Sequence, residues 1–165
     1  LRLQKDNKLG FGDGARDIPF VQQMQWTDCG AASLGIILGY HGRYVGLEDL
    51  RVACGVSRDG STASNLLKAA RSYSMEAKGF KYELEDLYKA RPPFIIFWNF
   101  NHFLVVEGFG RNGVFLNDPA SGPRQVTYEE FDQSYTGVTL TLQPGPTFTN
   151  VNDFRALLVL GRDGR

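Results

Sequence analysis

The stretch VQQMQWTDCGAASLGIILGYHG, residues 21–42, changes from polar to apolar at its centre and carries one of the two cysteines of the chain. After Asp28, small and apolar residues recur at helical spacing, which predicts a helix with Asp28 as N-cap and an end near Gly39 and Gly42. Cys29 would stand at its first turn, where unpaired N–H groups and the helix dipole stabilise a nucleophilic thiolate. The alternative is that Cys29 is a small buried hydrophobic residue, the commoner role of a lone cysteine.

The composition is that of one ordinary globular domain. The chain has 165 residues, of which 42% are hydrophobic and 22% charged, enough for a single core. Lys plus Arg and Asp plus Glu both number 18, so we expect no nucleic-acid partner. No apolar run is long enough to span a membrane, and the start lacks the apolar core of a signal peptide. The two cysteines, Cys29 and Cys54, are too few for a disulfide scaffold and suit a reducing compartment.

The first half of the chain reads as helices and the second half as strands. Further short helices are predicted at residues 46–55, 60–74 and 83–90. Runs rich in Val, Ile, Phe and Thr follow at residues 94–100, 102–110, 113–118, 124–131 and 137–143. GRNG at 110–113 and DPASGP at 118–123 predict hairpin turns, and 127–135 a helical turn before the last strand. This layout predicts an α+β domain, with N-terminal helices packed on a C-terminal antiparallel sheet.

The ends of the chain differ from its centre in composition. Residues 1–18 are polar and glycine-rich, which predicts a flexible lead-in. We expect the folded domain at residues 19–143 and a linker or tail at residues 144–165.

A thiolate nucleophile needs a base, and the chain has two histidines. His102 opens a predicted strand, where its side chain can face a cleft. His41 lies about three helical turns from Cys29, which is about 16 Å and beyond a hydrogen bond within a straight helix. His102 is therefore the better candidate, and His41 is expected to be solvated or to cap the helix.

The imidazole in such a site needs an acceptor on its second nitrogen, and Asp118 is the candidate. With the turn near Arg111 and Asn112, His102 and Asp118 are almost equally far from it along two neighbouring strands. Antiparallel pairing would therefore place them at the same end of the hairpin. Asp118 also begins an Asp-Pro turn, which is an ordinary structural role, and both roles are compatible.

Acyl transfer also requires donors for the oxyanion. The backbone N–H of Cys29 is one candidate. A glutamine amide from the preceding segment is a second, and the chemistry alone leaves Gln22, Gln23 and Gln25 open.

Three motifs in order, QMQWTDCGAASL, NHFLVVEGF and LNDPASGP, resemble the double-glycine leader peptidase domains of bacteriocin and peptide-exporting ABC transporters. The resemblance extends from about residue 19 to residue 143. It implies a papain-like cysteine peptidase with Cys29 as nucleophile, His102 as general base and acid, and Asp118 as its orienting residue. It selects Gln23 for the oxyanion, because the glutamine of that family stands six residues before the cysteine. It implies no metal ion and no cofactor.

The resemblance also implies a substrate and a location. Such domains remove N-terminal leaders after a Gly-Gly or Gly-Ala pair, at the cytoplasmic face of the bacterial membrane, before export of the mature peptide. The stretches VACGVSRDGSTASNLLKAAR and FWNFNHFLVVEGF favour the subgroup whose precursors carry nitrile-hydratase-like leaders. The expected partners are a precursor with an amphipathic helical leader and the transmembrane and ATP-binding domains of a parent transporter. No Walker A motif occurs in this chain. We expect the isolated domain to be a soluble monomer.

A double-glycine specificity requires a narrow groove closed by bulky side chains. Trp26 and Trp98 are the candidate walls, because each stands a few residues before Cys29 or His102. The alternative for Trp98 is a place in the core of the sheet. Two rival functions stay open: a leader-docking domain that does not cut, and another papain-like thiol amidase.

Overall fold

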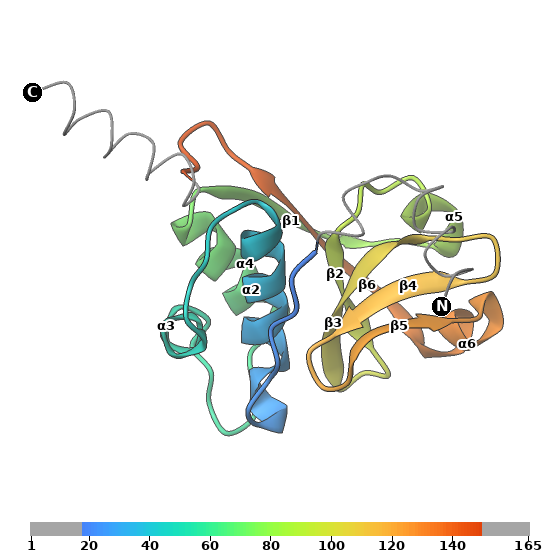
Figure 1. Ribbon diagram of the computed structural model, residues 1–165, viewed down its shortest axis with the longest axis horizontal. Helices are drawn as coiled ribbons and strands as arrows, with labels where there is room; N and C mark the ends of the chain where they lie inside the picture. The colour runs from blue at the N-terminus through green and yellow to red at the C-terminus, as the bar shows by residue number, and fades with distance from the viewer. Residues whose placement is uncertain (1–17, 150–165) are drawn as a thin grey trace, which may run out of the picture.

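The computed structural model describes residues 18–149 (Figure 1). Its helices are η2 (Trp26–Asp28, a 3-10 helix), α2 (Cys29–Tyr40), α3 (Leu47–Ala53), α4 (Ala63–Ser72), α5 (Leu84–Leu87) and α6 (Tyr128–Ser134). Its strands are β1 (Met75–Lys81), β2 (Phe94–Trp98), β3 (His102–Phe109), β4 (Val114–Asp118), β5 (Gly122–Val126) and β6 (Tyr135–Pro144). The predicted lead-in at 1–18 and the predicted linker or tail at 144–165 lie outside the described residues, except for residue 18 and residues 144–149.

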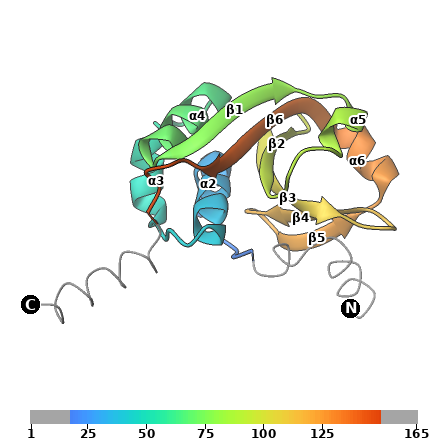
Figure 2. The same ribbon diagram turned by 90° about the horizontal axis from the view of Figure 1, so that it is seen from above.

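Within residues 18–149 the strands form one six-stranded antiparallel sheet in the order β1-β6-β2-β3-β4-β5. Figure 2 shows that β1 and β6 cross the whole molecule, with α2, α3 and α4 on one side and α5 and α6 on the other. The predicted turn at GRNG is present, since the Gly110 N–H donates to the Gly113 carbonyl at 2.7 Å. The predicted α+β organisation is therefore confirmed.

One strand departs from the predicted order of helices first and strands afterwards. β1 lies between α4 and α5 and pairs with β6 at the edge of the sheet. Its sequence, MEAKGFK, contains two lysines, a glutamate and a glycine but no β-branched residue. β1 therefore lacks the residue composition typical of a strand, and it is extended because it pairs with β6.

The centre of the sheet is buried on both faces, which explains the nearly unbroken apolar run of β2. Side chains alternate between two clusters. Ile95, Phe103 and Val105 face the helices α2, α3 and α4 in the first cluster. Ile96, Leu104 and their neighbours from β4, β5 and α6 form the second cluster, on the opposite face.

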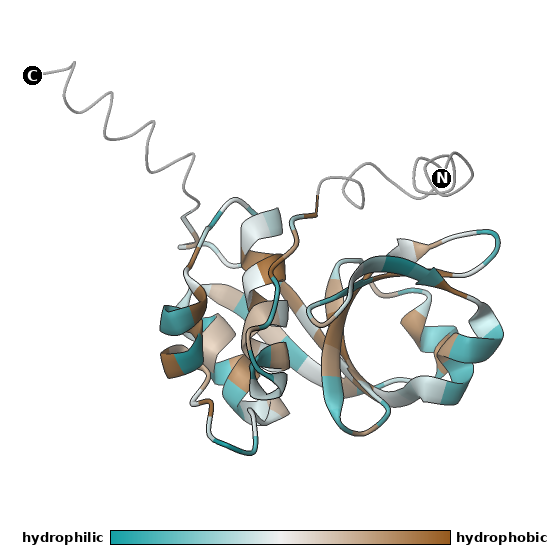
Figure 3. Ribbon diagram, turned by 60° about the horizontal axis from the view of Figure 1, so that its bottom comes forward, coloured by the Kyte–Doolittle hydropathy of each residue, from teal (hydrophilic) through white to brown (hydrophobic). Residues whose placement is uncertain are grey.

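Helix α2 is the central element of the helical half. All its residues from Cys29 to Gly39 are buried, because α3 and α4 pack on one side of it and β3 on the other. Figure 3 shows hydrophobic segments on this helix and on the strands beside it, and hydrophilic segments toward the outer loops. No helix in the described part of the chain is long and apolar enough to cross a membrane. The packing of α2 on β3 fixes the position of its first residue, Cys29, against the sheet.

Candidate active site

Cys29 is the first residue of α2, as predicted, and Asp28 precedes it at the N-cap position. The Asp28 carboxylate does not cap α2, however, because it accepts from Met24, Gln25 and Arg51 instead. Cys29 is 7% exposed, and its Sγ accepts a hydrogen bond from the Phe103 backbone N–H at 3.4 Å. Phe103 directly follows His102 at the start of β3. The sulfur therefore lies where the first turn of the helix meets the beginning of the strand, with a backbone donor directed at it.

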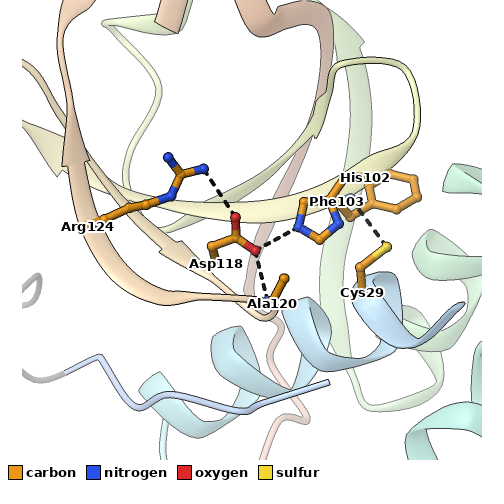
Figure 4. Close-up of polar contacts among 6 residues, drawn as sticks. All are labelled: Cys29, His102, Phe103, Asp118, Ala120 and Arg124. Atoms are coloured by element: carbon orange, nitrogen blue, oxygen red, sulfur yellow. Dashed lines mark hydrogen bonds and ion pairs between the residues drawn. The ribbon is translucent and has the colours of Figure 1, made fainter. Parts of the chain in front are cut away.

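His102 lies between Cys29 and Asp118 (Figure 4). Its Nε2 lies 2.7 Å from Asp118 Oδ1, and the other edge of its ring lies beside the Cys29 sulfur (Figure 4). The helix supplies the sulfur, β3 the imidazole and β4 the carboxylate. The structure thus brings together the three residues that the sequence identified.

The imidazole is biased toward its protonated form. Burial lowers the pKa of His102, but the hydrogen bond to Asp118, the charge of that carboxylate and the adjacent Cys29 sulfur outweigh burial and raise the pKa from 6.5 to about 9. At neutral pH the site therefore holds an imidazolium beside the sulfur, which is the arrangement that activates a cysteine nucleophile.

Asp118 is held by more partners than the sequence predicted. Its Oδ1 accepts from the Ala120 N–H at 2.9 Å, and its Oδ2 accepts from Arg124 Nη2 at 3.2 Å. Burial raises the pKa of Asp118, whereas the hydrogen bonds from His102, Ala120 and Arg124 keep it below its ordinary value. The same carboxylate therefore forms the Asp-Pro turn and orients the imidazole.

The backbone of Gln23 is hydrogen-bonded to the turn that follows Asp118. The Gln23 N–H donates to the carbonyl of Pro119, the residue after Asp118, at 3.0 Å. Gln23 is half-buried, whereas Gln22 and Gln25 are exposed. Within the described residues the Gln23 Oε1 is buried without a hydrogen-bond partner. These placements favour Gln23 over the other two glutamines for the oxyanion role.

The two tryptophans occupy different environments. Trp26 in η2 is 66% exposed and lines a surface pocket of about 390 Å³ next to the start of α2. Trp98 is 5% exposed, pairs in register with His102 and packs against Phe131 in the second cluster. The Arg124 guanidinium lies over its ring, 5.9 Å from the centroid. Trp98 therefore has the core position that the sequence left open as the alternative, and it supports the His102 strand from inside.

The second histidine and the second cysteine are both outside this site. His41 is the C-cap residue of α2, at the opposite end from Cys29. Cys54 is fully buried and not disulfide-bonded, and burial raises its pKa to about 12. Residues 18–149 contain no group of three or more His, Cys, Asp or Glu side chains that could hold a metal ion.

Two arginines of the site were missed from the sequence. Arg124 could have been found, because the tight DPASG turn pairs Asp118 with Gly122 and places Arg124 two residues further on the same face. Arg51 in α3 binds the carboxylate of Asp28 with two hydrogen bonds, of 2.9 and 2.8 Å. Arg51 lies 23 positions after Asp28 in the sequence, and no local pattern predicts that pair.

Residues 17–147 match the Peptidase C39 family. The chain is 34% identical over 133 residues to the colicin V secretion/processing ATP-binding protein of Escherichia coli. The match covers 81% of this chain, which spans 19% of the length of that relative.

The fold resembles solved structures with high coverage. One is a double-glycine motif protease from an AMS/PCAT transporter in complex with the leader peptide, with a TM-score of 0.76 and 52% identity over 78% of this chain and 92% of that chain. Another is the peptidase domain of Streptococcus ComA, a bifunctional ABC transporter involved in a quorum-sensing pathway. Its TM-score is 0.73, with 25% identity over 77% of this chain and 98% of that chain. The predicted papain-like fold class is therefore confirmed.

Proposed function

This chain belongs to the peptidase C39 family and is a cysteine peptidase domain, and we propose that it removes N-terminal leaders from precursor peptides by cutting after a Gly-Gly or Gly-Ala pair. The observation that carries the proposal is the position of His102, which is hydrogen-bonded to Asp118 and has its ring beside the Cys29 sulfur (Figure 4). The 52% identity to a double-glycine motif protease supports the choice of substrate.

The proposed reaction has two steps. The Cys29 sulfur attacks the carbonyl carbon of the second residue of the small-residue pair, and the oxyanion accepts hydrogen bonds from the Cys29 N–H and the Gln23 amide. His102 gives its proton to the leaving nitrogen as the C–N bond breaks, which leaves a thioester on Cys29. His102 then takes a proton from water, whose oxygen attacks the thioester carbonyl and releases the leader carboxylate and the sulfur.

The small-residue specificity has a structural candidate in Trp26. Its exposed indole stands three residues before the nucleophile, and we propose that it forms one wall of a groove for the scissile pair. Glycine passes such a wall because it has no Cβ. Trp98 presents at most its edge to a substrate, because its side chain is buried.

The wider setting is a peptide exporter. We propose that residues 19–143 form the peptidase domain of an ABC transporter, with 1–18 a lead-in and 144–165 a link toward a membrane domain. The domain would act at the cytoplasmic face of the bacterial membrane, as a monomeric unit beside transmembrane and ATP-binding domains. The E. coli relative, a secretion/processing ATP-binding protein, supports this setting. We extend the proposal to precursors with amphipathic, nitrile-hydratase-like leaders because of the stretches VACGVSRDGSTASNLLKAAR and FWNFNHFLVVEGF.

Mass spectrometry of synthetic double-glycine precursors incubated with the domain tests the proposal. We expect a single cut after the pair, absent in Cys29→Ala and after thiol alkylation. Binding of the leader without any cut by the wild type would favour the docking function instead. Free acceptance of Ala or Ser at both positions of the pair would favour a broader thiol amidase.

A further inference from the structure

The carboxylate of Asp28, the residue before the nucleophile, is bound from two directions. Its Oδ2 accepts from the backbone N–H groups of Met24 and Gln25, at 3.1 and 2.9 Å. Arg51 from α3 binds both oxygens, through Nε at 2.9 Å and Nη2 at 2.8 Å. The Asp28 side chain is 1% exposed and that of Arg51 is 29% exposed. A buried carboxylate with two charge-assisted and two backbone hydrogen bonds is a rigid anchor.

The segment bound by this anchor contains Gln23. At its other end, the Gln23 N–H donates to the Pro119 carbonyl, next to Asp118. The backbone from Gln23 to Asp28 is thus held at both ends, by Pro119 at one end and by the Asp28 carboxylate at the other. Because the Gln23 Oε1 has no hydrogen-bond partner within the described residues, the direction of its amide depends on the backbone that carries it.

We propose that Asp28 and Arg51 are positioning residues of the oxyanion site, which hold the Gln23 amide at a fixed separation from the Cys29 N–H. The inference rests on the proposed peptidase function and deepens it. An oxyanion donor contributes only if it lies at hydrogen-bond distance from the place where the charge develops. Breaking the anchor frees the segment from Met24 to Asp28, and Gln23 then no longer meets that requirement.

The test compares Arg51→Met with Gln23→Ala and with the double variant, on a double-glycine peptide. We expect Arg51→Met to lower kcat by about 10- to 100-fold with little change in KM. In the Gln23→Ala background, Arg51→Met should lower kcat by less than about twofold, because the amide that Arg51 positions is no longer there. Alkylation of Cys29 by iodoacetamide should keep its rate, since that reaction develops no oxyanion. Equal losses in both backgrounds would overturn the inference.

A matched control removes another half-buried arginine of the helical half. Arg43 packs on the Tyr73 ring, 5.1 Å from its centroid, and touches none of the catalytic groups. Arg43→Met should leave kcat within about twofold of the wild type. If Arg51→Met does not fold, Arg51→Lys keeps the charge but loses the two-pronged geometry, and should show the same dependence on Gln23 to a smaller degree.

A second measurement needs no substrate. Amide hydrogen exchange at Met24 and Gln25 should accelerate by at least about tenfold in Arg51→Met, while the core of α2 keeps its protection. Unchanged exchange at these two amides would overturn the positioning role by itself. Failure of the wild type to cut any double-glycine peptide would instead contradict the proposed function. The exchange result would still decide whether Arg51 holds the segment from Met24 to Asp28.

Discussion

Asp118 divides its two oxygens between two tasks. Oδ1 faces the His102 ring and the Ala120 amide, and Oδ2 faces Arg124. An asparagine has nearly the same shape but carries no charge and replaces one acceptor oxygen by a donor. We therefore expect the charge of Asp118, and not only its shape, to matter for the protonation of His102.

Replacement of Asp118 by Asn should change the pH profile of the reaction. In the proposed mechanism the active form carries a protonated His102, so we expect the alkaline limb of kcat/KM to follow the loss of that proton, near pH 9 in the wild type. Without the carboxylate the pKa of His102 falls toward 6.5. We expect kcat to drop by about 10²- to 10⁴-fold and the alkaline limb to move to lower pH, with leader affinity largely kept.

Leader affinity separates this effect from misfolding. Isothermal titration of Asp118→Asn with a leader peptide should give a dissociation constant within about threefold of the wild type. An alkaline limb that stays near pH 9 in the variant would show that Asp118 does not set the protonation of His102.

At the level of residues, the sequence predicted the site residues whose positions depend on local sequence patterns. Cys29 follows from the change of polarity at Asp28, and His102 with Asp118 from the symmetry of one hairpin. Arg51 and the Phe103 amide could not be predicted, because they reach Asp28 and Cys29 only through the packing of α3 and β3 on α2. The burial of Trp98 likewise depends on α6, whose Phe131 covers it.

At the level of elements, the hairpin β3–β4 carries the catalytic geometry, and its turn packs closely on β5. A Cβ added at Gly113 would lie 1.9 Å from the Val126 carbonyl oxygen and 2.9 Å from its carbon. Both are backbone atoms, so no side-chain rotation can relieve the contact. The glycine is required here for space.

Gly113→Ala should therefore destabilise the domain by about 2–3 kcal/mol, measured by urea unfolding. Gly46→Ala is the matched control, since a Cβ there meets nothing within 4 Å. Its cost should stay below about 1 kcal/mol, from its N-cap position in α3. Equal losses in the two variants would show that the β3–β4 turn does not require its glycine.

The strand that the sequence missed marks the limit of element prediction. Tyr73 and Ser74, the latter at φ 66°, join the helix α4 to β1. Within the described residues the only strand that pairs with β1 is β6, more than fifty residues later. In contrast, β2 and β3 carry their own signal, because burial on both faces demands continuous apolar sequence.

At the level of the whole molecule, the site lies on the contact between the helical half and the sheet, so folding and the protonation of His102 are coupled. The pKa of His102 is raised from 6.5 to about 9 in the folded state, and the folded protein binds that proton more tightly than the unfolded chain. This contribution to stability is complete below pH 6.5 and is lost as the pH rises through 9.

The free energy of unfolding of the wild type should therefore exceed that of His102→Gln most at pH 6, and the difference should shrink by about 3 kcal/mol by pH 10. Urea unfolding of both proteins across this range measures it. Asp118 stays ionised throughout, because its pKa lies below its ordinary value. A difference that is constant or grows with pH would contradict the coupling.

The most direct test of the catalytic pair is covalent trapping with a peptidyl chloromethyl ketone that ends in Gly-Gly, followed by mapping of the adduct by mass spectrometry. The account predicts one thioether, formed as the Cys29 sulfur displaces chloride, with Cys54 unmodified because it is fully buried with a pKa of about 12. The rate should fall steeply in His102→Gln and for an Ala-Ala reagent. An adduct on Cys54, or a rate that is the same without His102, would contradict it.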